Sequence, residues 1–393
     1  MVLTKKGGTE MITAIKIRLK PTKEQEILFR KSCGVARWSY NYFLAESESY
    51  YAAHKKTLKE TEVRKYINNV LKPTTHTWLK EVGSNVMKQA VKDANLARQR
   101  WFKGISDKPK FKSKHKCKDS FYVNYESLKR TKDGFRGEKI GNVKTCGSLP
   151  KLKKNEHYLN PRISFDGKHW YLSVSYEKEF EQVKLTDESL GIDLGIKDLA
   201  VVSNGKVYKN INKTKKVKRL EKKLKREQRK LSRKIENNIS GYTKNRKPIY
   251  KKPLREMKNI GKQQKVIKNL YKRLSDIRKN HLHQTTNDIV KTKPYRIVME
   301  DLNVRGMMKN KHLAKAVASQ GFYEFKRQIK YKSARLGIAF VEVDRWYPSS
   351  KTCSHCGKIK KDLKLSDRTF CCECGFTLDR DFNASINLAS YQI

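Results

Sequence analysis

Four cysteines near the end of the sequence have the spacing of a metal site. Cys353-Ser-His-Cys356 and Cys371-Cys-Glu-Cys374 together read C-x2-C-x14-C-x2-C. Two such pairs can bring four thiolates to one tetrahedral ion, and an ion with no open coordination position stabilises a fold and does not catalyse. The sequence therefore predicts a structural zinc ion in a small ribbon, with iron as the minor alternative.

The residues around these pairs support the metal site but allow two choices for one of its ligands. Gly357 and Gly375 each follow a pair and allow the backbone to turn tightly around an ion. Cys372 lies beside Cys371 and would be the substitute if Cys371 were displaced. Five of the eight cysteines fall in the last 41 residues, and this clustering indicates metal in a reducing cytoplasm instead of a secreted disulfide framework.

Three separated acidic residues form a second candidate site. Asp193 lies on an apolar strand that begins a hairpin, Glu300 ends a later strand, and Asp381 opens the last helix. This is the order of an RNase H-like fold, in which three carboxylates meet at one sheet edge and hold two divalent ions for phosphodiester cleavage. Hard oxygen ligands favour magnesium or manganese. The alternative for each acid alone is a helix cap or a solvated surface group.

Three further acids are weaker candidates for the same site. Asp198 and Asp379 lie close in sequence to Asp193 and Asp381, and Asp301 directly follows Glu300. Because side chains alternate along a strand, we expect Asp301 to point away from Glu300.

The charge balance points to a polyanionic partner. The 393 residues contain 90 Lys and Arg against 39 Asp and Glu, a formal net charge of +51. A solvated surface explains an excess of a few charges, whereas an excess of this size is typical of proteins that bind nucleic acid. No run approaches the roughly 20 apolar residues that a membrane helix needs, so a membrane partner is not expected.

The first half of the chain predicts a helical domain inserted into a β-domain. Residues 11–19 alternate as in a strand, and Thr22 with Gln25 has the pattern of a capping box at the start of a helix. Ser84 is the expected N-cap of a further helix over residues 85–102. A hairpin with an Asp166-Gly167 turn then indicates a β-barrel or an open sheet.

A long basic helical hairpin is predicted in the second half. Residues 213–236 hold 13 Lys and Arg against 3 acids, with apolar residues at helical spacing. The apolar stripe of the return helix is expected at Val266, Leu270, Leu274 and Ile277. A coiled hairpin with a solvated outer face is the alternative, but this density of cations suits a phosphate-lined channel better.

The motifs together resemble the TnpB family, nucleases encoded by insertion sequences and related to type V CRISPR effectors. The resemblance covers nearly the whole chain. It rests on Ile17-Arg-Leu-Lys-Pro-Thr22 and Ala36-Arg-Trp-Ser-Tyr-Asn41 near the start, on Gly191-Ile-Asp-Leu-Gly-Ile-Lys197, on Tyr347-Pro-Ser-Ser350, and on the cysteine pairs running into Asp379-Arg-Asp-Phe-Asn-Ala384.

The resemblance implies a multidomain α+β and α/β fold with a wedge β-barrel, an inserted helical recognition domain, an RNase H-like RuvC nuclease domain and a four-cysteine zinc ribbon. The expected boundaries are 1–21 and 105–183 for the wedge barrel, 22–104 for the recognition domain, 184–352 and 375–393 for the nuclease with its basic hairpin at 213–283, and 353–374 for the target-binding ribbon.

The resemblance also implies an activity and partners. The expected activity is RNA-guided cleavage of double-stranded DNA beside a short flanking motif, with Asp193, Glu300 and Asp381 as the catalytic triad. A guide RNA from the transposon end, a cytoplasmic location and a monomer with its RNA are expected. The alternatives are a guided DNA-binding regulator without cleavage and a guide-independent structure-specific nuclease.

Nine residues are candidates for contact with nucleic acid. The helix that begins near Ser84 resembles the one that reads the flanking motif, and two further basic segments suit phosphate contacts. The candidates are Ser84, Asn85, Lys88, Lys110, Lys112, Lys222, Lys225, Arg226 and Arg229.

Overall fold

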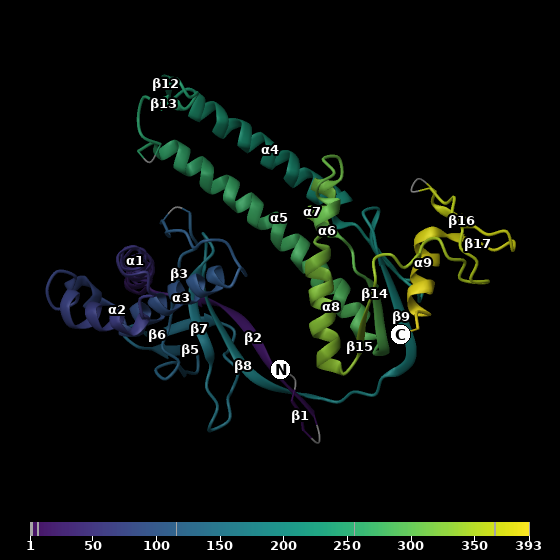
Figure 1. The fold of residues 1–393 in the computed structure, drawn as a ribbon, viewed down its shortest axis with the longest axis horizontal. Coiled ribbons are helices and arrows are strands. Elements are labelled where there is room, and N and C mark those ends of the chain that lie inside the picture. Colours follow the sequence, from purple (N-terminus) through teal and green to yellow (C-terminus); the bar gives the residue numbers. More distant parts are fainter. Residues whose placement is uncertain (1–2, 6–7, 115, 255, 365–366, 393) are drawn as a thin grey trace. The chain divides into compact units, whose positions relative to one another are not determined.

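The computed structural model describes residues 3–5, 8–114, 116–254, 256–364 and 367–392. The chain forms two compact units, one of Met11–Lys178 and the other of Met1–Glu10 with Glu179–Ile393 (Figure 1). None of the helices in the described ranges is long and apolar enough to cross a membrane.

The helices of the first unit are α1 (Lys23–His54), α2 (Glu60–Tyr66) with the π-helical turn Ile67–Leu71, a 3-10 helix (Thr77–Glu81) and α3 (Ser84–Phe102). The predicted capping box of α1 is confirmed, because the Thr22 and Gln25 side chains each accept a hydrogen bond from the other's backbone N–H, at 3.3 and 3.1 Å. The N-cap predicted for α3 is wrong by one residue: Gly83 takes that position and Ser84 is already helical.

The sheet associated with this unit has the strand order β3-β7-β8-β2-β6-β5-β4, with β1 paired to β2. The predicted hairpin is confirmed, since β7 and β8 pair from Phe165 with Trp170. The strands are β1 (Leu3–Lys5), β2 (Gly8–Lys20), β3 (Ser120–Tyr122), β4 (Lys129–Arg130), β5 (Gly134–Gly137), β6 (Gly141–Cys146), β7 (Leu159–Phe165) and β8 (Trp170–Glu181).

The core of the first unit joins α1 to its sheet. Phe29 of α1 is fully buried, and its ring centroid lies 5.7 Å from that of Phe121 on β3 and 5.1 Å from that of Trp170 on β8. Burial of large aromatic side chains of this kind contributes strongly to stability. The helical segment is therefore tied to the sheet and not an independent bundle.

The second unit is built on a five-stranded mixed sheet of order β11-β10-β9-β14-β15. The first three strands are antiparallel, whereas β14 runs parallel to both β9 and β15. The strands are β9 (Thr186–Leu194), β10 (Asp198–Val202), β11 (Val207–Lys209), β14 (Pro294–Glu300) and β15 (Ala339–Val343).

Helices cover both faces of this sheet. On one face, Ile297 and Met299 of β14 pack in one apolar cluster with α5 (Lys258–Lys291) and α8 (Phe322–Leu336). On the other face, Val298 packs against Leu388 of α9 (Arg380–Ala389). The alternation of side chains along β14 thus assigns each face its own helices.

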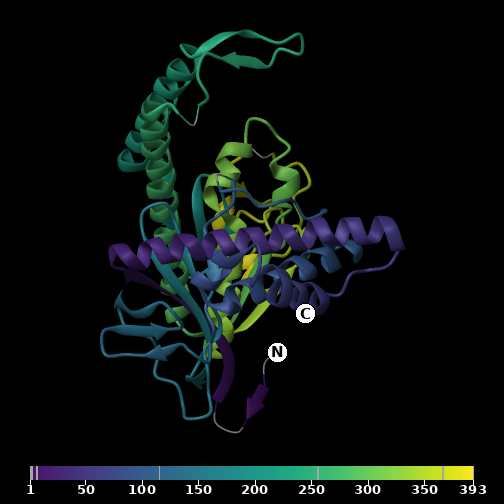
Figure 2. The same cartoon turned by 90° about the vertical axis from the view of Figure 1, so that its left-hand side faces the viewer.

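The predicted basic hairpin is present and consists of α4 (Lys215–Glu236) and α5, with the strands β12 (Ile239–Tyr242) and β13 (Pro248–Tyr250) at its tip (Figure 2). Val217 and Leu224 of α4 pack against Leu270 and Leu274 of α5. The stripe predicted for α5 is wrong at Val266, which is 41% exposed, because Ile267 occupies the buried position instead.

The remaining elements are short. They are the 3-10 turn Ile211–Lys213, the helices α6 (Val304–Met307) and α7 (Ala314–Gln320), and the antiparallel strands β16 (Thr369–Cys371) and β17 (Thr377–Asp379), which precede α9.

Candidate active site and metal centre

Two of the three predicted acids lie on one face of the mixed sheet. The parallel pairing of β9 and β14 runs as far as Ile192 with Met299, so Asp193 and Glu300 follow at the same sheet edge. Ile192 and Met299 both belong to the apolar cluster under α5 and α8. Because alternate side chains point to opposite faces, Asp193 and Glu300 point to the face that α9 covers.

Gly191 allows α9 to approach that face closely. A Cβ atom at Gly191 would lie 2.0 Å from the carbonyl oxygen of Ser385 and 2.4 Å from the backbone nitrogen of Ala389, both on α9. Any side chain here would therefore push the helix away. Glycine two residues before Asp193 thus brings the helix that carries Asp381 against the strand that carries Asp193.

The start of α9 separates the capping acid from the candidate catalytic acid. Asp379 is the N-cap, and its Oδ1 accepts hydrogen bonds from the backbone N–H groups of Asp381 and Phe382, at 3.0 and 3.1 Å. The capping alternative raised for Asp381 therefore belongs to Asp379. Asp381 lies in the first turn, where its carboxylate accepts a 3.0 Å hydrogen bond from Arg380.

The acids influence one another electrostatically. Loss of solvent on burial, together with the negative charges of Asp381 and Glu300, raises the pKa of Asp193 from 3.8 to about 8, while Arg380 acts in the opposite direction. Burial and the charge of Asp301 also raise the pKa of Glu300. Without a cation, Asp193 is therefore mostly protonated at neutral pH. Such a shift is typical of carboxylates that a positive ligand stabilises when it is bound.

In the described part of the chain, these three carboxylates do not all come within 4.8 Å of one another. The structure brings the acids to one sheet edge without a completed ligand set.

The weaker acidic candidates have other partners. Asp301 forms ion pairs with Lys326 at 2.9 Å and with Arg345 at 3.0 Å, as expected for a side chain that points away from Glu300. Asp198 lies 3.4 Å from the Lys209 amine.

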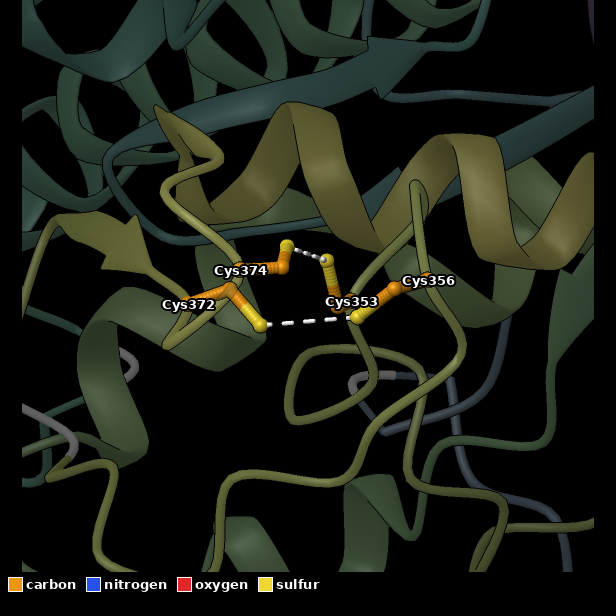
Figure 3. A group of neighbouring side chains, drawn as sticks. All are labelled: Cys353, Cys356, Cys372 and Cys374. Atoms are coloured by element: carbon orange, nitrogen blue, oxygen red, sulfur yellow. Dashed lines mark hydrogen bonds between the residues drawn. The ribbon is translucent and has the colours of Figure 1, made fainter.

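A four-cysteine cluster lies between two loops that face each other (Figure 3). The sulfur atoms of Cys353, Cys356, Cys372 and Cys374 all lie within 4.8 Å of one another. The closest contacts are 3.9 Å between Cys353 and Cys374 and 3.6 Å between Cys356 and Cys372. Four soft sulfur donors at this spacing match the ligand set of a tetrahedral zinc or iron site.

The cluster corrects one predicted ligand, because it contains Cys372 in place of Cys371. Cys371 ends β16, and its backbone pairs with Thr377 of β17, so its exposed side chain lies outside the cluster. The second turn is one residue tighter than the first: Gly375 N–H donates to the carbonyl of Cys372, three residues back, whereas Gly357 N–H reaches Cys353, four residues back. Because Cys371 and Cys372 are adjacent, the spacing of the cysteines does not show which of the two is the ligand.

Two buried asparagines connect the cluster to α9, and no role was predicted for them. Asn383 is fully buried; its Oδ1 accepts from the N–H of Ser354 at 3.0 Å, and its Nδ2 donates to the Thr352 carbonyl at 2.7 Å. Asn387 donates to the same carbonyl at 2.6 Å and to that of Ser349 at 2.7 Å. The sequence signal for this role is that the two asparagines are four residues apart, and so lie on one face of a helix that begins just after the cysteines.

The candidate nucleic-acid residues lie in three separate places. Ser84, Asn85 and Lys88 are half-buried in the first two turns of α3. Lys110 and Lys112 lie on the extended segment that follows α3 and are exposed. The α4 residues are also exposed: Lys222, Lys225, Arg226 and Arg229.

Comparisons with known proteins agree along the chain. Residues 11–56 match a model described as "Helix-turn-helix domain", residues 171–311 one described as "Probable transposase", and residues 322–388 the "Cas12f1-like, TNB domain". A Streptomyces pristinaespiralis protein that carries the name RNA-guided DNA endonuclease is 28% identical over 95% of this chain and 88% of its own. The TnpB-like protein L770 of Acanthamoeba polyphaga mimivirus is 24% identical over 96% and 72%.

The chain is similar to TnpB proteins along nearly its whole length. The cryo-EM structure of a Cas12f1–sgRNA–target DNA complex has the same fold, with a TM-score of 0.56 over 97% of this chain and 99% of that chain at 14% identity. Relative to the TnpB expectation, the mixed α/β fold and the four-cysteine cluster are confirmed, with the ligand correction given above.

Proposed function

We propose that this chain is a TnpB-type, transposon-encoded, RNA-guided DNA endonuclease. The observation that supports the proposal is that Asp193 and Glu300 point to the sheet face covered by α9, the helix whose first turn carries Asp381. A relative named RNA-guided DNA endonuclease matches this chain over 88% of its own length. The close approach of α9 at Gly191 supports a shared site for acids more than 180 residues apart in sequence.

The three acids would hold magnesium or manganese ions. Their oxygen donors suit these hard cations, and the raised pKa of Asp193 fits a cluster that is stabilised by added positive charge. Such ions, when bound, neutralise charge on the attacking and leaving oxygens of a phosphodiester. Arg380 holds the Asp381 carboxylate at 3.0 Å, and Asp379 fixes the first turn of α9 beneath it.

The cysteine cluster would hold a structural zinc ion. Its four thiol donors leave no position open for a reacting molecule, so its role is to order the ribbon. Through Asn383 and Asn387 the ordered ribbon would also hold α9, and with it Asp381, in place.

The partners would be a guide RNA and a target DNA. The protein would act in the cytoplasm, with one protein chain bound to each guide. The net charge of +51 and the exposed cations of α4 support phosphate binding, and sequence choice would be delegated to base pairing. We also propose that the chain is divided as the sequence predicts. The domains are a wedge barrel, a recognition domain, a RuvC-like nuclease with residues 184–352 and 375–393, and a target-binding ribbon.

Sequencing the RNA that copurifies with the protein tests this function most simply. A single RNA species should be enriched, and the complex should cut DNA complementary to part of it when magnesium is present. An enriched RNA with tight target binding but no cleavage would favour a guided regulator. Cleavage of branched DNA without any RNA would favour a guide-independent nuclease.

A further inference from the structure

A surface hollow of about 490 Å³ lies between α1, α3 and the segment that follows α3, all within the first unit. Its volume falls in the range of roughly 300–1,000 Å³ that is typical of small-ligand sites. Leu44 of α1 is buried in its lining, and most other lining residues are aromatic or basic; the acidic residue in the lining is Glu48.

The outer wall of the hollow is held firmly although it has no regular secondary structure. The side chain of Asn41 on α1 accepts from the backbone N–H of Lys112 and donates to its carbonyl, both at 2.8 Å. At the other end of this wall, Lys108 forms an ion pair with Glu48 of α1. The segment 108–112 therefore lies along α1 as a preformed wall.

A buried cation without an anionic partner lines this hollow. Arg98 of α3 is only 7% exposed, yet it forms no ion pair or hydrogen bond among the described residues, and its guanidinium instead lies over the Phe102 ring at 5.2 Å. Burial lowers its pKa, against the effect of Glu48, which is already paired with Lys108. Of the buried polar atoms in the described ranges that lack a hydrogen-bond partner, none is a nitrogen of Arg98, so its unpaired guanidinium can bind an anion from solvent.

Aromatic rings lie around this cation and remain open to solvent. Tyr51, Phe102 and Phe111 are 45%, 50% and 62% exposed, and the rings of Trp101 and Phe102 stack with centroids 4.8 Å apart. Exposed aromatic rings beside basic groups are the usual platform for single-stranded nucleic acid, because any base can stack on them.

We propose that this hollow, which we call the Arg98 pocket, binds one unpaired nucleotide, with the base against Phe102 and Phe111 and the phosphate near Arg98. An apolar peptide would leave Arg98 uncompensated, and a duplex keeps its base faces covered. The inference rests on the proposed function only in taking nucleic acid as the ligand.

Binding of short oligonucleotides tests the pocket without guide or target. We would measure fluorescence anisotropy of labelled ten-nucleotide uridine RNA and thymidine DNA, at about 0.5 M salt, where purely ionic attraction is weakened. Arg98→Gln and Phe111→Ala should each weaken binding about ten-fold. Arg100→Gln, an exposed arginine on the same helix, and Tyr323→Ala, an aromatic that is 71% exposed on the other unit, should change it less than about two-fold.

An abasic oligonucleotide of the same length should bind the wild-type protein weakly. Its affinity should match that of the Phe111→Ala variant for the oligonucleotide with bases. A loss confined to RNA would assign the pocket to the guide, and a loss confined to DNA to the displaced or target strand. Phe111 is exposed, so its replacement should not disturb folding. Equal affinities for Phe111→Ala, Arg98→Gln and Arg100→Gln would overturn the proposal, whether or not the protein cleaves DNA.

Discussion

At the scale of single residues, burial and the neighbouring acids make Asp193 hold its proton tightly. Its pKa is about 8 in the folded protein and 3.8 ordinarily. A raised pKa of an acid means that the folded state holds the proton more tightly than the unfolded state. The contribution of Asp193 to stability is therefore fully present below pH 3.8 and is lost as the pH rises toward 8.

This sign gives a stability prediction. Without added magnesium, Asp193→Asn should be more stable than the wild type at about pH 8 by at least about 1 kcal/mol, and the difference should shrink toward about pH 5. The difference in the free energy of unfolding can be measured by urea unfolding in magnesium-free buffer. No chelator is added, because a chelator would also remove zinc. Added magnesium should stabilise the wild type and not the variant. A difference independent of pH would contradict the electrostatic origin.

The cysteine correction is also a single-residue question. Cys372→Ser should reduce bound zinc to well below one equivalent and loosen the ribbon, because three thiolates leave the metal open. Cys371→Ser should keep one equivalent, since its side chain lies outside the cluster. Elemental analysis and the thiolate bands of a cobalt-substituted protein report this without any activity assay. The reverse outcome would restore the ligand set that the sequence spacing predicts.

At the scale of elements, the closest fit in the site is that of α9 on β9. Gly191→Ala should push α9 outward, destabilise the protein by about 1–3 kcal/mol and lower cleavage at least ten-fold, because the added Cβ meets backbone atoms at 2.0 and 2.4 Å. Gly261→Ala on α5 is the matched control, as nothing lies within 4 Å of its new Cβ. Wild-type cleavage by Gly191→Ala would mean that the position of α9 is not critical.

Local patterns predicted most elements, but not the details that depend on distant contacts. The capping box at Thr22 and the hairpin after β7 are local and were predictable. The burial of Ile267 instead of Val266 depends on the rotation of α5 against α4, and both residues fit an apolar stripe. The clash at Gly191 arises from a helix nearly 200 residues away, so the local sequence pattern indicates only a buried strand.

At the scale of the whole molecule, the net charge of +51 points to a polyanionic partner, and we propose that the exposed cations of α4 supply part of the contacts. Replacing its four candidate cations by glutamine should weaken RNA binding and reduce the salt dependence of the affinity by up to about four counterions. As a control, replacing each lysine by arginine and each arginine by lysine keeps the charge and should keep the slope of affinity against salt concentration. An unchanged slope in the glutamine variant would mean that these side chains face solvent. The four are Lys222, Lys225, Arg226 and Arg229.

The central claim is that Asp193, Glu300 and Asp381 act together as the catalytic centre of a guided nuclease. The most direct measurement compares target binding and magnesium-dependent cleavage for Asp193→Ala, Glu300→Ala and Asp381→Ala, each purified with its copurifying RNA, with Asp198→Ala as a control. Each of the three variants should bind target about as tightly as the wild type and lose cleavage by at least about a thousand-fold, because base pairing and basic surface carry affinity whereas the acids carry the metal. Substantial cleavage by all three would contradict the account.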